Sequence, residues 1–503
     1  MVAIGCGSFS AMLPGRAAAQ SVDAQTYHVL GVTAYDPAEV LSYAAQVALQ
    51  REGRVTPGVL ADTLEVIYRE DGYFLAEVWV GDDGRTILVN EGQIDTLSIE
   101  GVDAGTFRLI RKYFAPVLGK HAVRLDQFER SIMLVEDIGS ISATAEVEYP
   151  AGQENAHVRI VAREEDSASG YLTLDNPARE FGDAAVLTFG QQFTSALTAG
   201  DFLRFELSAT EYFGEGDSSV FGAVTYRMPL GGNGSYGELY FGNVLADRDA
   251  SGTLERTDIE GNTAILAFGH PVIRDIERYG YALFELRQTA SSVTLPSVGF
   301  DADVDVLSAS WVYGAALSHG GAWEYAANLS YGRSQSNFGG VGTDDETFWH
   351  LRAGLGYQRP VSWFGENSSL HAEFWGQYTS DALPAIEEFY LGGIDDERGY
   401  AFAEVQGDIG LSASIEVSRD LYPDSQYLRR IRPFGFLDAG YVKNNEPSAS
   451  ETTEETFASV GLGLDLEFKG NVFLRNYVAV PLSDGPTTSA GDPAFYLSLT
   501  KTW

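Results

Sequence analysis

The chain has few of the residues on which several classes of protein depend. One cysteine, Cys6, occurs in 503 residues, which excludes a disulfide scaffold, a cysteine-based zinc site and thiol catalysis in the rest of the chain. No run of 18 apolar residues occurs, so the sequence offers no transmembrane helix. Basic residues are also scarce, with 33 Lys and Arg against 71 Asp and Glu. Because nucleic-acid binding needs a cationic surface, we expect no nucleic-acid partner.

Catalytic and metal-binding motifs are equally scarce. The seven histidines are scattered and form neither an H-E-x-x-H motif nor a pair at helical spacing. No G-x-S-x-G elbow occurs. We therefore predict no catalytic residue, no metal site and no cofactor, and a protein that is not an enzyme.

The N-terminus is small and apolar. Ala17, Ala18 and Ala19 precede Gln20, and small residues at this spacing are typical of a secretory cleavage site. The pattern predicts a signal peptide at residues 1–19. A disordered apolar N-terminus is the alternative.

Residues 27–166 contain one pattern twice: strand, helix, helix, strand, strand. The first copy covers residues 27–93 and the second covers residues 94–166. In the first copy, Asp36 and Pro37 are suited to begin a helix. We predict two small α+β domains.

Residues 167–503 alternate between apolar and polar side chains almost throughout. Sixteen such segments can be counted, and Phe202–Thr210 is the clearest. The last segment ends in Trp503 and has the period of two that a final barrel strand needs. A membrane-spanning strand requires about 9–11 residues, which this length accommodates. The predicted fold is a 16-stranded antiparallel transmembrane β-barrel; a soluble all-β domain is the alternative.

Charge restricts where polar side chains of this barrel can lie. Residues 167–503 carry 20 basic and 46 acidic side chains. A charged side chain facing lipid at mid-depth costs about 2–4 kcal/mol for Arg or Lys. We therefore expect these charges in the lumen, turns and loops.

A long connection interrupts the alternation, and we predict that it folds inward over about residues 382–404. Further on, Phe436, Asp438 and Gly440 share one face of a strand. If that face lines the lumen, Asp438 needs a cation, and Arg398 on the loop could supply it as a bidentate partner. Alternatively, Arg398 is a solvated loop arginine and Asp438 one lumen carboxylate among many.

Taken in this order, these features resemble a known family. Two repeats, a barrel, an Arg398-Gly399-Tyr400 loop and the Phe436-x-Asp438-x-Gly440 strand are similar to the POTRA-plus-barrel superfamily of the outer membrane. Within it, the chain resembles the two-partner secretion transporters (TpsB) of the ShlB/FhaC/HecB type. Two repeats rather than three or five favour this branch. The other matching residues are Asp175 and Asn176 after the first barrel strand, and Phe389, Gly392 and Gly393 at the loop base.

The resemblance implies POTRA 1 at residues 27–93, POTRA 2 at residues 94–166 and the barrel at residues 167–503. It also implies that Arg398 lies at the tip of the inward-folded loop and pairs with Asp438. Glu397 stands where the family usually has an apolar residue, which puts the packing of the tip in question. The short segment before residue 27 has no room for the plug helix that many relatives carry.

The implied function is ATP-independent secretion of an unfolded exoprotein, which the POTRA domains recognise in the periplasm. The implied partners are that exoprotein, the lipid and lipopolysaccharide of the outer membrane, and the barrel assembly machinery that inserts the protein. Two alternatives remain: an assembly factor of the same superfamily, and a passive porin.

Overall fold

The computed structural model describes residues 27–149, 155–176, 184–213, 217–249, 256–338, 343–394, 396–447 and 453–503. The predicted signal peptide, residues 1–19, lies outside these ranges. The chain divides into two compact units, with the main boundary in the sequence between residues 165 and 166. Within the described ranges, none of the helices has the length and apolar character needed to cross a membrane.

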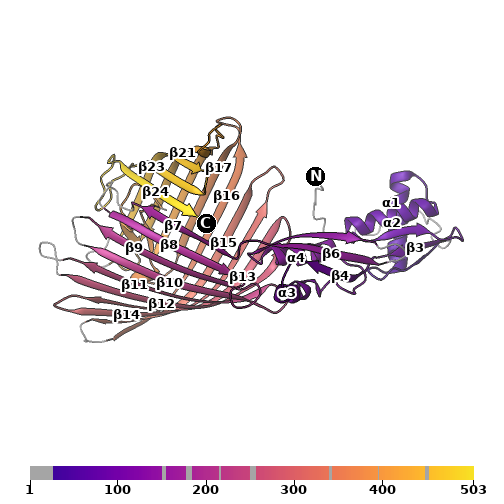
Figure 1. Ribbon diagram of the computed structural model, residues 1–503, viewed down its shortest axis with the longest axis horizontal. Helices are drawn as coiled ribbons and strands as arrows, with labels where there is room; N and C mark the ends of the chain where they lie inside the picture. The colour runs from indigo at the N-terminus through magenta and orange to yellow at the C-terminus, as the bar shows by residue number, and fades with distance from the viewer. Residues whose placement is uncertain are drawn as a thin grey trace. The chain divides into compact units, whose positions relative to one another are not determined.

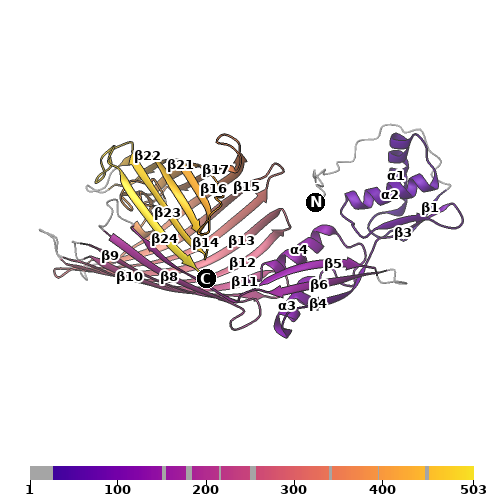
Figure 2. The same ribbon diagram turned by 45° about the horizontal axis from the view of Figure 1, so that its top comes forward.

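The first repeat is a three-stranded sheet covered by two helices (Figure 2). Its elements are β1 (His28–Leu30), α1 (Pro37–Glu52), α2 (Pro57–Glu70), β2 (Glu77–Val80) and β3 (Thr86–Asn90). The sheet order is β1-β3-β2, with β1 parallel and β2 antiparallel to β3. Asp36 caps α1 and Thr56 caps α2 through their side-chain oxygens. The buried face of α2, including Leu60 and Leu64, packs with Ile87 in one core.

The second repeat has the same order of elements. They are β4 (Ile94–Glu100), α3 (Ala104–Phe114), α4 (Leu125–Glu136), β5 (Ile141–Glu148) and β6 (Ala156–Glu164). The sheet order β4-β6-β5 again places the last strand in the middle, parallel to the first. Asp103 caps α3. The identical topology shows that the two copies are one structural repeat.

The second unit is a closed barrel of sixteen antiparallel strands, in which β24 pairs with β7 (Figure 1). Its first eleven strands are β7 (Ala168–Asp175), β8 (Ala184–Thr194), β9 (Phe202–Tyr212), β10 (Ser218–Leu230), β11 (Ser235–Arg248), β12 (Thr257–Arg274), β13 (Arg278–Thr294), β14 (Gly299–Ala316), β15 (Ala322–Phe338), β16 (Thr343–Val361) and β17 (Ser368–Tyr378). The remaining five are β20 (Ile409–Arg419), β21 (Leu428–Lys443), β22 (Glu454–Phe468), β23 (Val472–Pro481) and β24 (Ala494–Thr502). The predicted fold class, two α+β repeats followed by a 16-stranded barrel, is confirmed.

The two sides of the barrel wall differ in polarity. In β14, the side chain of Leu307 is exposed, whereas that of its neighbour Ser308 is buried. Ser308 forms a hydrogen bond with Ser330, which lies opposite it on the adjacent strand β15. The outward apolar residues include Leu207, Leu239, Leu266, Leu286, Leu307 and Leu329, each more than half exposed. A closed sheet with an apolar outer band satisfies its backbone internally and suits a hydrocarbon surrounding.

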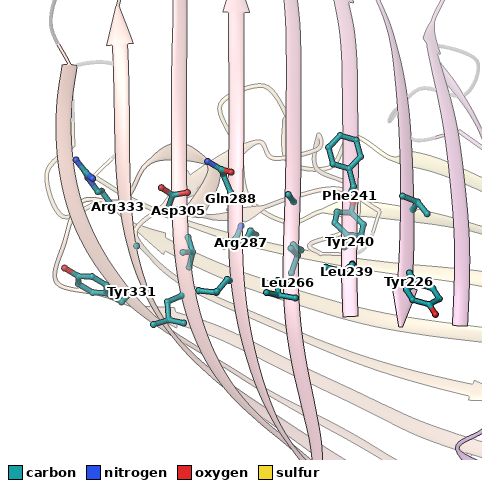
Figure 3. Close-up of a pocket in the computed structure, with 17 residues that line it drawn as sticks. Tyr226, Leu239, Tyr240, Phe241, Leu266, Arg287, Gln288, Asp305, Tyr331 and Arg333 are labelled. Atoms are coloured by element: carbon teal, nitrogen blue, oxygen red, sulfur yellow. The ribbon is translucent and has the colours of Figure 1, made fainter. Parts of the chain in front are cut away.

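A hollow of about 890 Å³ follows this wall between β10 and β15. Figure 3 shows Arg333, Asp305 and Gln288 at one level of the wall, and Tyr331, Leu266 and Leu239 at the next. Leu239, Leu266, Leu286 and Leu307 of its lining belong to the outward apolar band, so we do not assign a functional site to the hollow.

The long connection between β17 and β20 has a structure of its own. It contains the 3-10 helix η2 (Ala385–Glu387) and a small hairpin formed by β18 (Phe389–Leu391) and β19 (Val405–Gly407). Leu391, Tyr400 and Val405 of this loop are buried in one cluster with Val442 of β21 and Phe457 of β22. The loop therefore packs against the barrel wall, in the region where the sequence predicted an inward fold.

Candidate functional site

The tip of the loop is joined to the barrel wall by an ion pair between Arg398 and Asp438. Arg398 Nε donates to Asp438 Oδ2 at 2.8 Å, and Nη2 donates to Oδ1, also at 2.8 Å. The Arg398 backbone N–H adds a third bond to Oδ2 at 3.1 Å. Their side chains are only 8% and 3% exposed. This is the bidentate geometry in which arginine binds a carboxylate most specifically.

A second carboxylate from the wall reaches the same guanidinium. Arg398 Nη1 lies 3.2 Å from Glu416 Oε2 on β20, and Arg475 Nη2 on β23 lies 3.1 Å from the same oxygen. Ser414 accepts from Arg398 Nη2 and donates to Asp438 Oδ1. The sequence analysis missed Ser414 and Glu416. Strand register could have found them, because Ser414 lies directly opposite Asp438 and Glu416 opposite Phe436.

Phe436 supports the guanidinium from one side. The Arg398 Cζ atom lies 3.4 Å from the centre of the Phe436 ring, and a ring face attracts a cation most where water is excluded. Tyr477 meets the Phe436 ring edge-to-face at 5.7 Å between centroids. Phe436 and Asp438 therefore both contact Arg398, one through its ring and the other through its charge.

Tyr400 fixes the other side of the tip. Its ring is fully buried and stacks on Phe457 with centroids 4.2 Å apart. Its hydroxyl lies within hydrogen-bond distance of the carbonyl oxygens of Ala458 at 2.8 Å and Ser483 at 2.9 Å. Gly399, between Arg398 and Tyr400, lies against Ala479 of β23.

Glu397 packs inside the tip although its side chain is an ionisable carboxyl group. A Cβ at Gly440 would lie 2.3 Å from Glu397 Oε1, so the glycine of the strand motif makes the space that this carboxyl occupies. Glu397 is fully buried, and neither of its oxygens has a hydrogen-bond partner in the described part of the chain. Burial, with a contribution from nearby Asp396, raises the pKa of Glu397 to about 8. The carboxyl is therefore predominantly neutral at pH 7.

The predicted loop-base residues shape the hairpin. Phe389 packs on Gly410, the second residue of β20, where a Cβ would lie 2.1 Å from its ring. Gly392 and Gly393 have φ values of 99° and 133°, which turn the chain after β18.

Asp175 and Asn176 lie at the barrel seam, away from the loop tip. Asp175 pairs in register with Ser498. The Asn176 side chain donates to the Phe495 carbonyl at 2.8 Å and accepts from the Leu497 N–H at 2.5 Å. It thereby continues the β7–β24 ladder beyond the last strand residue.

Nothing in the described ranges places three or more His, Cys, Asp or Glu side chains where they could hold a metal ion.

The arrangement at the tip is suited to hold a loop in one position by charge, ring stacking and close packing.

A family model described as haemolysin secretion/activation protein ShlB/FhaC/HecB matches residues 154–466, more than half of the chain. No curated protein sequence matches significantly.

Solved structures of similar fold include two CdiB proteins. CdiB from Escherichia coli has a TM-score of 0.77 at 17% identity, over 99% of this chain and 93% of that chain. CdiB from Acinetobacter baumannii has a TM-score of 0.74 at 12% identity, over 94% and 89%. BamA from Haemophilus ducreyi lacking POTRA domains 1–3 has a TM-score of 0.56 at 14% identity, over 95% and 100%.

At these identities the structures establish the POTRA-plus-barrel fold, and the family model establishes the family. The predicted resemblance is confirmed: the chain belongs to the ShlB/FhaC/HecB family of haemolysin secretion/activation proteins, the two-partner secretion transporters of the outer membrane.

Proposed function

We propose that this transporter takes an unfolded exoprotein at its two POTRA repeats, placed in the periplasm, and passes it through the barrel without ATP. The loop between β17 and β20 occupies part of the path, and the Arg398–Asp438 pair holds its tip in the working position. The observation that carries the proposal is the bidentate pair between loop and wall, at 2.8 Å in both bonds. Because the planar guanidinium binds both carboxylate oxygens, and the pair is buried, the contact tolerates little displacement of the tip.

The repeats offer a suitable surface for an extended client. Each three-stranded sheet has its last strand in the middle, so β1, β2, β4 and β5 are edge strands. An extended segment can add to such an edge through backbone hydrogen bonds that depend little on its sequence. Contacts with lipopolysaccharide, and insertion by the barrel assembly machinery, belong to the same proposal.

Reconstitution tests this function directly. Purified transporter is placed in liposomes without nucleotide, and the exported protein of a neighbouring gene is added unfolded on the POTRA side. We expect protease-protected client to accumulate inside, with prefolded client as the matched control. No uptake of the unfolded client, or equal uptake of the unfolded and prefolded forms, would contradict the proposal.

The same assay separates the alternatives. Client-independent conductance without translocation would indicate a porin. Insertion of added barrel proteins into the liposome membrane would indicate an assembly factor.

A further inference from the structure

A second charged cluster contacts the beginning of the loop, at Glu387. Glu387, the last residue of η2, is fully buried. One of its carboxylate oxygens lies 2.8 Å from Arg287 Nη2 on β13, and the other lies 3.1 Å from His350 Nε2 on β16. Arg352 of β16 lies 3.9 Å from the second oxygen. The carboxylate thus faces two guanidinium groups and one imidazole.

The main chain of Glu387 is held by the same wall. Its carbonyl oxygen accepts from Arg352 Nη2 at 2.8 Å and from Gln377 Nε2 of β17 at 3.1 Å. Arg352 and Gln377 are themselves bonded, Nε to Oε1, at 2.5 Å. Side chain and backbone of one loop residue are therefore bound by three different strands.

The two clusters contact different sets of barrel strands. The tip contacts β20, β21, β22 and β23, whereas Glu387 contacts β13, β16 and β17. In the closed order of sixteen strands, β13 and β23 are eight strands apart in either direction. Since β17 and β20 are neighbours, the two clusters together attach the loop along one continuous stretch of wall from β13 to β23.

We propose that Glu387 is a second anchor, a positioning residue that fixes the base of the loop to the β13–β16 wall. With both ends held, the loop is fixed along this stretch of wall, and loss of the tip contact alone frees only part of the loop. The inference rests on the proposed transport function, because it assigns that function's loop a second point of attachment.

Substitution of Glu387→Gln removes the charge while keeping the side-chain shape. Glu285→Gln is the matched control, because Glu285 on β13 also lies near Arg287, at 3.7 Å, but belongs to the wall and not to the loop. Glu387→Asp retains the carboxylate and should rescue part of the effect.

A nitroxide at Ile386→Cys, an exposed position next to the anchor, reports loop mobility. We expect an immobilised spectrum in the parent and in Glu285→Gln, and a mobile one in Glu387→Gln. In planar bilayers, Glu387→Gln combined with Arg398→Ala should raise the open fraction by about tenfold over either single variant. The second anchor would be overturned if Glu387→Gln and Glu285→Gln gave equal label mobility and, each combined with Arg398→Ala, equal open fractions.

Heat-dependent gel migration shows whether each barrel is folded. If Glu387→Gln does not fold, Gln377→Ala, which removes one donor to the Glu387 carbonyl, takes its place with a smaller expected change. The readouts also separate the two proposals. A label that is immobile in the parent and mobile in Glu387→Gln, with no client transport by the parent, would retain the anchor and contradict the transport function.

Discussion

The two ends of the loop are anchored with opposite polarity. At the tip, the loop supplies the cation, Arg398, and the wall supplies Asp438 and Glu416. At the base, the loop supplies the carboxylate, Glu387, and the wall supplies Arg287 and Arg352. Each anchor would be repelled by the other's wall, since like charges in a poorly solvated site disfavour each other. The charge pattern therefore fixes the orientation of the loop as well as its attachment.

The largest effect should come from removing the principal carboxylate at the tip. Asp438→Ala leaves the Arg398 guanidinium buried with Glu416 as its remaining anionic partner, and breaking a buried pair costs about 3–5 kcal/mol. We expect secretion into the medium to fall by at least about tenfold, since 1.4 kcal/mol is a factor of ten. Glu416→Ala is the matched comparison and should reduce secretion less, because the Arg398 side chain keeps its two bonds to Asp438. A greater loss in Glu416→Ala would reverse the assigned roles.

Opposite polarity is tested by reversing charge at the base. Glu387→Arg brings a third guanidinium beside Arg287 and Arg352, and we expect a mobile loop and a leaky channel in bilayer recordings. Adding Arg287→Glu restores one attractive pair across the same contact and should recover part of the closed fraction. If the double variant leaks as much as Glu387→Arg, the pairing of these two residues does not hold the base.

The tip also depends on the space beside Gly440. In Gly440→Ala the new methyl meets the Glu397 carboxyl, and overpacking of this kind costs about 1–3 kcal/mol. We expect reduced secretion and increased loop mobility. Glu397→Ala in the same chain removes the closest clash, leaving Leu391 Cδ2 at 2.8 Å from the new methyl, and should restore part of the tip. Failure of this rescue would separate Glu397 from Gly440.

Raising the pH from 4.5 toward 8 should loosen the tip and not the base. Glu397 lies on the loop, and its pKa of about 8 in the packed tip exceeds the ordinary carboxyl value of 4.5. The packed tip therefore binds more protons than the released one between these values, so its stability is greatest at low pH. It falls by about 1.4 kcal/mol per pH unit across this window. A nitroxide at exposed Phe402 should gain mobility as the pH rises toward 8, and Glu397→Gln should remove the pH dependence.

The smallest change is expected from a contact outside both anchors. Asn176→Ala removes the side-chain bonds to Phe495 and Leu497 at the seam, each worth about 0.5–1.5 kcal/mol. The unfolding temperature in heat-dependent gel migration should fall, while loop mobility and conductance stay at parent values. A leaky channel in this variant would link the seam to the loop.

Much of the fold can be predicted from the spacing of apolar side chains and from the residues that begin helices or form turns. The start of α1 at Pro37 agrees with the sequence prediction, because a capping Asp36 and a proline mark it. Alternation likewise identified the lumen face of β21, where Phe436 and Asp438 are buried and Leu437 is exposed.

The parts of the site that were not predicted depend on contacts between distant strands. Arg475 on β23 meets Glu416 on β20 across two intervening strands, a contact that no single strand pairing predicts. Glu387 has no sequence signal of its own, since Arg287 is 100 residues away. Glu397 was expected to disturb the tip, but its fit depends on the space at Gly440, which a face assignment alone does not reveal.

A double-mutant cycle of Arg398→Ala and Asp438→Ala, read as client secreted into the medium, tests the central claim most directly. If the pair holds the loop in its working position, the double variant loses little more than either single variant, because one interaction is removed in all three. Losses that add in full would show that the two residues act independently and would contradict the assignment.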